Sequence, residues 1–198
     1  RQRQMCIRDS FNTSLPPFDN VKVRQAFLSA IDQDELIKTM TSFTSHPFGN
    51  TVVKAKGLLP PGLPGYNSSL PSLAFDLEES LSTLAETNYS TDTIPPLTFN
   101  TVGASPLPAA IAKMWQDNLG VSINIVSLPN YSMLKDSSGH LYDFGWSAYY
   151  PNPQNFLEIL FRSKQEFNYG AYENSAFDEL VINASLETSL DKRLLLYQ

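Results

Sequence analysis

Residues 145–156, GWSAYYPNPQNF, contain four aromatic side chains, two prolines and no charged residue. Trp146, Tyr149 and Tyr150 each offer a large apolar face with a polar tip, which is the chemistry of solute binding. Pro151 and Pro153 stiffen this loop and so lower the ordering cost of capturing a ligand. The same aromatic residues could equally form a small core beneath a long loop. The residues by themselves leave both interpretations open.

Catalytic chemistry has little support in the sequence. His46 and His140 lie in polar, loop-like segments, and neither belongs to a catalytic motif. The chain has no HExxH, GxSxG, CxxC, GxGxxG or GxxxxGK[ST] pattern, which argues against zinc, serine-hydrolase and nucleotide-phosphate sites. Most carboxylates stand at helix starts, where the helix dipole stabilises them. We therefore predict a protein that is not an enzyme, with no cofactor and no metal site.

Composition narrows the class of protein. The 198 residues carry a net charge of −6, and 42% of them are hydrophobic, so the chain is a globular protein with a sizeable core. An acidic chain is a poor partner for nucleic acid or for an anionic membrane surface. The sequence contains no apolar run of about 18 residues that could span a bilayer.

The helices and strands that must position residues 145–156, called the aromatic loop below, can be predicted from hydrophobic spacing. The alternation of strand 95–102, helix 107–118 and strand 121–126 predicts a βαβ unit, and therefore a parallel or mixed sheet. A further strand, 141–146, leads directly into the loop. Amphipathic helices are expected over 19–32, 33–43, 77–88, 153–161 and 174–187. In the third of these helices Leu77, Leu81, Leu84 and Ala85 should be buried, and in the last Phe177, Leu180, Val181 and Ala184. A short strand is expected around Thr51–Val53, within an irregular connection over 44–72.

Both ends of the chain look cut. RQRQMCIRDS resembles the translated adapter DNA found in metagenomic data, so residues 1–10 are interpreted as a sequencing-adapter artefact that includes Cys6. The alternative is a genuine irregular N-terminus. The last predicted helix, SLDKRLLLYQ, ends without a capping glycine. We therefore interpret the chain as an internal fragment of a longer protein.

Six segments carry a family resemblance. They are, in chain order, FNTSLPPFDNVKVRQAFLSAID, LPPGLPGYN, FDLEESLSTLAETNY, MWQDNLGVSINI, GWSAYYPNPQNFLEILF and NYGAYENSAFDELVINASLE. Together they resemble the landmarks of the extracytoplasmic solute-binding proteins of family 5, the oligopeptide- and dipeptide-binding proteins of ABC importers. The resemblance runs from Phe11 to Gln198.

This resemblance implies an α/β fold, namely an incomplete periplasmic-binding-protein-like type II lobe with a mixed sheet flanked by helices. Residues 11–198 would form most of the C-terminal lobe of a bilobal protein, truncated at both ends. A peptide or related solute would bind between two hinged lobes and pass to the permease subunits of an ABC importer. The location would be the periplasm or the outer face of the bacterial cytoplasmic membrane, and the membrane would be met only through the transporter or a missing lipid anchor. The alternatives are a non-peptide solute, such as an oligosaccharide or a metal chelate, and a secreted hydrolase.

The resemblance also implies a set of ligand-facing residues, and one departure from the family pattern. The implied ligand-binding residues are Trp146, Ser147, Ala148, Tyr149, Tyr150, Asn152, Asn155 and Tyr172. Peptide binders of the family commonly have Asp at the position of Tyr149, where it pairs with the peptide ammonium, and a second Asp at the position of Asn152. Either another acid in the absent lobe replaces them or the ligand has no free amine. Our hypothesis is a relaxed or neutral specificity, for an oligosaccharide or a blocked peptide.

Overall fold

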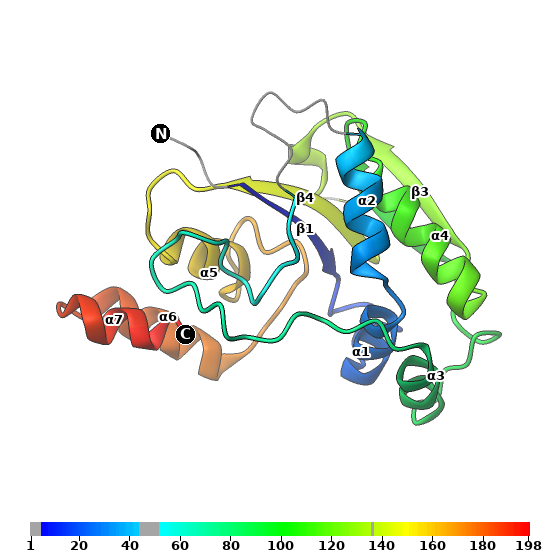
Figure 1. Cartoon of the computed structure of the whole chain (residues 1–198), viewed down its shortest axis with the longest axis horizontal. Helices are drawn as coiled ribbons and strands as arrows, with labels where there is room; N and C mark the ends of the chain where they lie inside the picture. The colour runs from blue at the N-terminus through cyan, green and yellow to red at the C-terminus, as the bar shows by residue number, and fades with distance from the viewer. Residues whose placement is uncertain (1–4, 44–51, 136) are drawn as a thin grey trace.

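The computed structural model describes residues 5–43, 52–135 and 137–198. Its centre is a four-stranded sheet in the order β1-β4-β2-β3 (Figure 1). The strands are β1 (Met5–Phe11), β2 (Leu97–Val102), β3 (Ile123–Leu128) and β4 (Leu141–Ser147). β1 pairs antiparallel with β4, whereas β2 pairs parallel with both β3 and β4. The predicted mixed α/β sheet is therefore confirmed.

The predicted βαβ unit is present as β2, α4 (Leu107–Leu119) and β3. Leu107, Ile111, Met114 and Trp115 are the buried stripe that the helical spacing predicted. Gly120 ends α4 with a φ of 68°, a left-handed conformation that glycine adopts without a steric cost. The helix packs on one face of the sheet beside α2 (Figure 1).

One face of the sheet is covered by α4 together with α1 (Val21–Ser29), α2 (Gln33–Phe43) and α3 (Leu77–Ala85). Leu97, Phe99 and Leu141 from the sheet meet Phe27 and Trp115 in this first core. The Trp115 Nε1 donates to the carbonyl oxygen of Phe27 at 2.7 Å, so the buried indole has its partner. Successive strand residues point to opposite faces, so Tyr142, Phe144 and Trp146 of β4 face the other side.

That second face is covered by α5 (Gln154–Phe161), α6 (Ser175–Leu186) and α7 (Leu190–Leu196), with the irregular segment 52–76 beside them (Figure 1). Phe156, Leu157 and Leu160 of α5 supply the centre of this second core. A short 3-10 helix, Tyr131–Met133, follows β3.

Two details of the predicted helices are corrected by the structure. In α3 the buried residues are Ser80 and Leu84, while Leu81 and Ala85 are exposed. The small Ser80 side chain lets α3 approach α1, and its Oγ donates to the Ala26 carbonyl oxygen at 2.6 Å. In α6 Val181 and Ala184 are buried as expected, but Leu180 is 46% exposed because it borders a surface pocket.

Two other expectations concern segments at the borders of the described residues. Val52 and Val53 belong to no strand, and Thr51 lies outside the described residues. The segment interpreted as an artefact overlaps β1, whose pairing with β4 runs from Met5↔Ser147 to Phe11↔Leu141. The interpretation of residues 1–10 remains a prediction. Across the described part of the chain, no helix is long and apolar enough to cross a membrane.

The contact between α1 and α3 gives a first prediction. Ser80→Ala removes the hydrogen bond from the Ser80 hydroxyl to the Ala26 carbonyl oxygen. This oxygen still accepts a hydrogen bond from the Ala30 backbone N–H, so we expect the free energy of unfolding to fall by only about 1 kcal/mol. Ser82→Ala, at an exposed position of the same helix, should change it by less than about 0.5 kcal/mol. Urea unfolding measures both, and equal effects would show that the Ser80 hydroxyl contributes nothing to the packing.

Candidate functional site

The candidate site lies where the chain leaves β2 and β4. These two strands are parallel neighbours, so their carboxyl ends lie at the same edge of the sheet. After β2 the chain crosses to α4 on the first face, and after β4 it crosses to α5 on the second face. In open α/β sheets a crevice forms where adjacent strands lead to opposite faces, and ligands bind there. The aromatic loop after β4 stands at this edge.

Trp146 anchors the loop and is itself buried. Its side chain is only 6% exposed, and its Nε1 donates to Asn155 Oδ1 at 2.9 Å. Asn155, on the first turn of α5, has no exposed surface, and its Oδ1 also accepts from the Tyr149 backbone N–H at 3.4 Å. Asn155 therefore ties the end of β4, the loop and α5 together. Its Nδ2 has no hydrogen-bond partner among the described residues.

Tyr149 and Tyr150 are the large exposed side chains of the loop. Tyr149 is 79% exposed and Tyr150 is 43% exposed, while Ser147 and Ala148 are half-buried. The Tyr149 ring stands edge-on to the Trp146 ring, with 5.6 Å between the ring centroids. A rigid loop thus presents one tyrosine ring to solvent at little entropic cost.

Asn152 acts locally on the helix that follows. Its Oδ1 accepts from the Gln154 backbone N–H at 2.9 Å, which satisfies a free donor in the first turn of α5. An Asp side chain would accept the same hydrogen bond, so the absence of charge at this position does not alter the loop's conformation.

Tyr172 stands apart from the other seven predicted residues. Its ring packs edge-on against Phe177, and its backbone N–H donates to Asn168 Oδ1 at 3.1 Å. Within the described part of the chain, these contacts and the hydrogen bond from Asn168 Nδ2 to the Tyr172 carbonyl oxygen do not involve the loop. The structure therefore brings together residues from Trp146 to Asn155, buries Trp146 and Asn155, and exposes Tyr149 and Tyr150. Their ligand-binding role remains a prediction.

A buried polar cluster, absent from the predicted site residues, lies at the same edge. Asp143 of β4 is 6% exposed and Thr101 of β2 is 4% exposed, and the Thr101 Oγ1 donates to Asp143 Oδ2 at 3.0 Å. Burial raises the pKa of the Asp143 carboxyl, while hydrogen bonds from Thr101 and Ser105 act in the opposite direction. The signal in the sequence was a single acid inside the otherwise uncharged strand LYDFGWS.

The histidines do not form a second site in the described residues. His140 precedes β4, where its Nδ1 accepts from the Thr98 backbone N–H at 3.2 Å and the His140 backbone N–H donates to the Thr98 carbonyl oxygen at 2.9 Å. Burial lowers the pKa of His140, which favours this neutral, accepting form. His46 lies outside the described residues. Nowhere in the described ranges do three or more His, Cys, Asp or Glu side chains gather as a metal site requires.

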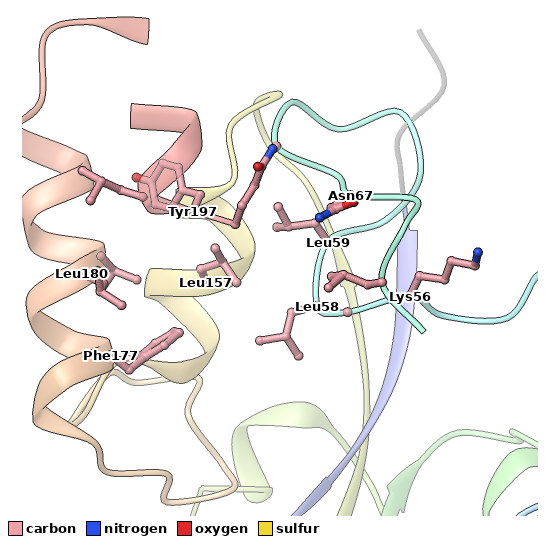
Figure 2. A pocket seen from close by; sticks show the side chains of 14 residues that line it. Lys56, Leu58, Leu59, Asn67, Leu157, Phe177, Leu180 and Tyr197 are labelled. Atoms are coloured by element: carbon pink, nitrogen blue, oxygen red, sulfur yellow. The ribbon is translucent and has the colours of Figure 1, made fainter. Parts of the chain in front are cut away.

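A separate pocket of about 260 Å³ lies between the segment 56–70 and helices α5, α6 and α7 (Figure 2). Leu58, Leu59, Leu157, Phe177 and Tyr197 line it, so it is mainly apolar. None of the eight predicted ligand-binding residues lines this pocket.

Comparison with known proteins places the chain in a family. The family described as bacterial extracellular solute-binding proteins, family 5 Middle, matches residues 6–168. Heme-binding protein A of Haemophilus influenzae is 31% identical over 96% of the chain and 35% of its own length. The dipeptide-binding protein of Escherichia coli is 29% identical over 96% of the chain and 36% of its own length. The chain thus spans about a third of these relatives.

Solved structures share the fold. The periplasmic binding protein DppA from Helicobacter pylori, in complex with the peptide STSA, superposes with a TM-score of 0.83 at 24% sequence identity. The superposition covers 99% of this chain and 39% of the DppA chain. The murein tripeptide-binding protein MppA of Escherichia coli superposes with a TM-score of 0.81 at 20% sequence identity. This superposition covers 98% of this chain and 38% of the MppA chain.

The Trp146–Asn155 hydrogen bond gives a second prediction. Asn155→Ala leaves the buried Trp146 Nε1 and Tyr149 N–H without an acceptor, so the free energy of unfolding should fall by about 3 kcal/mol. Asn183→Ala, at an exposed position on α6, should change it by less than about 0.5 kcal/mol. Urea unfolding measures the difference, and a red shift of tryptophan emission should accompany only the first variant. Equal stabilities would exclude Asn155 as the anchor of the loop.

The buried Asp143 carboxyl gives a third prediction. Its folded pKa is raised above the ordinary 3.8, so the folded protein keeps a proton that the unfolded chain has already lost. The associated stability is present below the unfolded pKa and is lost as the pH rises through the folded pKa. Asp143→Asn should therefore gain in melting temperature relative to the unmodified protein as the pH rises above the ordinary pKa of 3.8 and through the raised folded pKa. A difference that stays constant with pH would contradict the raised pKa.

Proposed function

The chain belongs to the bacterial extracellular solute-binding proteins of family 5, and from this premise we propose that it forms most of one lobe of a receptor for peptides or related solutes. The family and the relatives named above are solute-binding proteins rather than enzymes. In this proposal residues 11–198 are most of the C-terminal lobe of a bilobal protein. Since the chain spans about a third of its relatives, the other lobe would come from the rest of the receptor.

The observation that supports the binding site is the exposed tyrosine pair on a loop whose base is buried. Tyr149 is 79% exposed although the loop is held by Trp146 and Asn155. A ligand that contacts these tyrosines and also the other lobe gains both sets of contacts only when the lobes close. Ligand binding then shifts the population of the receptor toward its closed form. The permease subunits of an ABC importer, at the periplasmic or outer face of the cytoplasmic membrane, would recognise that form.

A metal chelate is the second candidate ligand. One relative that matches 96% of this chain is named for heme binding, and heme is an iron chelate with a large aromatic face. Exposed tyrosine rings suit such a face as well as they suit a peptide. Hemin therefore belongs in the test beside peptides.

The test uses the complete receptor that contains this chain, with a tryptic digest of casein and with hemin as separate probes. We expect the casein peptides to raise its melting temperature and to change its tryptophan fluorescence, because a ligand that binds only the folded state stabilises it. Hydrolysis of the peptides during the assay would favour the secreted-hydrolase alternative. A response to hemin alone would replace the peptide with a chelate, and a response to neither probe would contradict the proposal.

Tyr149 provides the matched variants for this test. Tyr149→Ala removes an exposed ring, so it should weaken binding of the casein peptides by about tenfold, a loss typical of a tyrosine contact, and leave the melting temperature of the free protein unchanged. Leu186→Ala, which alters a comparably exposed apolar residue on α6, should leave binding unchanged. Equal affinities of the two variants would remove Tyr149 from the site.

A further inference from the structure

The pairing between β2 and β4 is the shortest in the sheet. β1 and β4 pair over seven residues of each strand, and β2 and β3 pair over six. β2 and β4, by contrast, pair only at Phe99↔Leu141 and Asn100↔Tyr142. This β2–β4 junction joins two longer ribbons of two strands each. Because the junction is short, each hydrogen bond across it carries a large share of the connection.

His140 extends the β2–β4 junction by one residue at its amino end. Its backbone N–H donates to the Thr98 carbonyl oxygen at 2.9 Å, and its Nδ1 accepts from the Thr98 backbone N–H at 3.2 Å. On its other side, the His140 carbonyl oxygen accepts from the Asn12 backbone N–H at 2.8 Å. His140 therefore links β2 to the segment that follows β1, and its side chain makes one of the two hydrogen bonds to β2.

The imidazole of His140 takes a place that a backbone carbonyl oxygen fills within a regular ladder. Each strand residue offers one N–H and one carbonyl oxygen for pairing. β4 begins only at Leu141, and the Thr98 N–H receives its acceptor from a side chain instead. A backbone carbonyl oxygen accepts at every pH, whereas an imidazole nitrogen accepts only while it carries no proton. A proton can therefore remove this hydrogen bond without affecting the backbone pairs.

The sheet neighbours of His140 on its own face are uncharged in the described part of the chain. Side chains two positions apart on a strand share a face, so these neighbours include Ser10, Asn100 and Tyr142. The loop between α5 and α6 adjoins this face, where the Tyr169 ring contacts the Tyr142 ring. Other titratable groups of the adjoining segments are Asp19, Lys135, Asp143 on the opposite face, Glu166, Tyr169 and Glu173, while Asp136 lies outside the described residues.

We propose that His140 makes the β2–β4 junction sensitive to acid, because a proton on Nδ1 takes away the acceptor of the Thr98 N–H and loosens the junction. Two donors would then face each other in a half-buried place, which is unfavourable. Burial lowers the folded pKa of His140 below its ordinary 6.5, in agreement with this geometry. The stability that the neutral imidazole contributes is thus present above pH 6.5 and is lost as the pH falls from there through the lowered folded pKa.

This inference goes beyond the proposed function, because it does not depend on which solute binds. The family consists of extracellular proteins, which meet the pH of the cell's surroundings. A histidine that titrates below neutrality is suited to respond to that pH. The strand that loosens at its amino end, β4, is also the strand that leads into the aromatic loop.

The experiment measures hydrogen exchange in the complete receptor that contains this chain, by mass spectrometry of peptides that include Thr98. The unmodified receptor is compared with His140→Asn, whose Oδ1 lies as many bonds from the backbone as Nδ1 does and takes up no proton. At about pH 8 both should exchange the Thr98 N–H at similar rates. At about pH 5, below the ordinary histidine pKa, the unmodified receptor should exchange it about fivefold faster, an effect typical of one hydrogen bond.

Two further variants separate the imidazole from its surroundings. His140→Ala has no acceptor at either pH, so its Thr98 N–H should exchange faster than that of His140→Asn at both. Asp136→Asn tests the carboxylate four positions before His140 and should behave as the unmodified receptor does. Equal exchange by the unmodified receptor and His140→Asn at about pH 5 overturns the inference. Loss of the pH dependence in Asp136→Asn also overturns it, because a pair with that acid would then be the cause.

A measurement on the unmodified receptor keeps the inference testable if the variants of His140 do not fold. β3 pairs with the same strand, β2, through a backbone ladder, so peptides from 123–128 serve as the internal reference. Between about pH 8 and about pH 5, exchange at Thr98 should rise relative to exchange in β3, after correction for the intrinsic effect of pH on amide exchange. Equal changes in both peptides would show that acid loosens the whole sheet, and the specific role of His140 would be overturned.

Discussion

The rest of the structure depends on one strand, β4, being buried on both faces. Its odd-numbered residue Leu141 belongs to the first core, and its even-numbered residues Tyr142, Phe144 and Trp146 belong to the second. β4 also pairs with β1 on one side and β2 on the other. Because most side chains of this strand are buried and its backbone pairs along its length with β1, the loop that follows it starts from a defined position. The position of the candidate site therefore depends on the burial and pairing of β4.

The division of the helices between the two faces follows from the same strand. α4 returns the chain from β2 to β3 across the first face, and α5 takes it from β4 across the second. The backbone therefore diverges on either side of the β2–β4 pair, and only the loops and the ends of the strands remain at the edge. Polar residues that would be costly elsewhere in the core, such as Thr101 and Asp143, are grouped at this place.

The aromatic loop combines the two interpretations that its sequence left open. Trp146 belongs to the second core, with its indole N–H bound to Asn155, while Tyr149 and Tyr150 remain exposed. Core and candidate binding surface are thus consecutive parts of one segment. The buried part makes the exposed part rigid, and a rigid aromatic surface loses little entropy when a ligand binds.

Periodic patterns in the sequence determined the elements, because they depend only on local spacing. The hydrophobic spacing over 95–126 predicted a strand, a helix and a strand, and the structure contains them as β2, α4 and β3. The family motifs determined the fold class. Only the tertiary structure decided which face of α3 is buried, because Ser80 faces α1 through a hydrogen bond to Ala26, 54 positions away in the chain. It likewise decided that Asn155 is buried and that Asp143 meets Thr101, since these environments arise from contacts between segments whose distance in sequence leaves no local pattern.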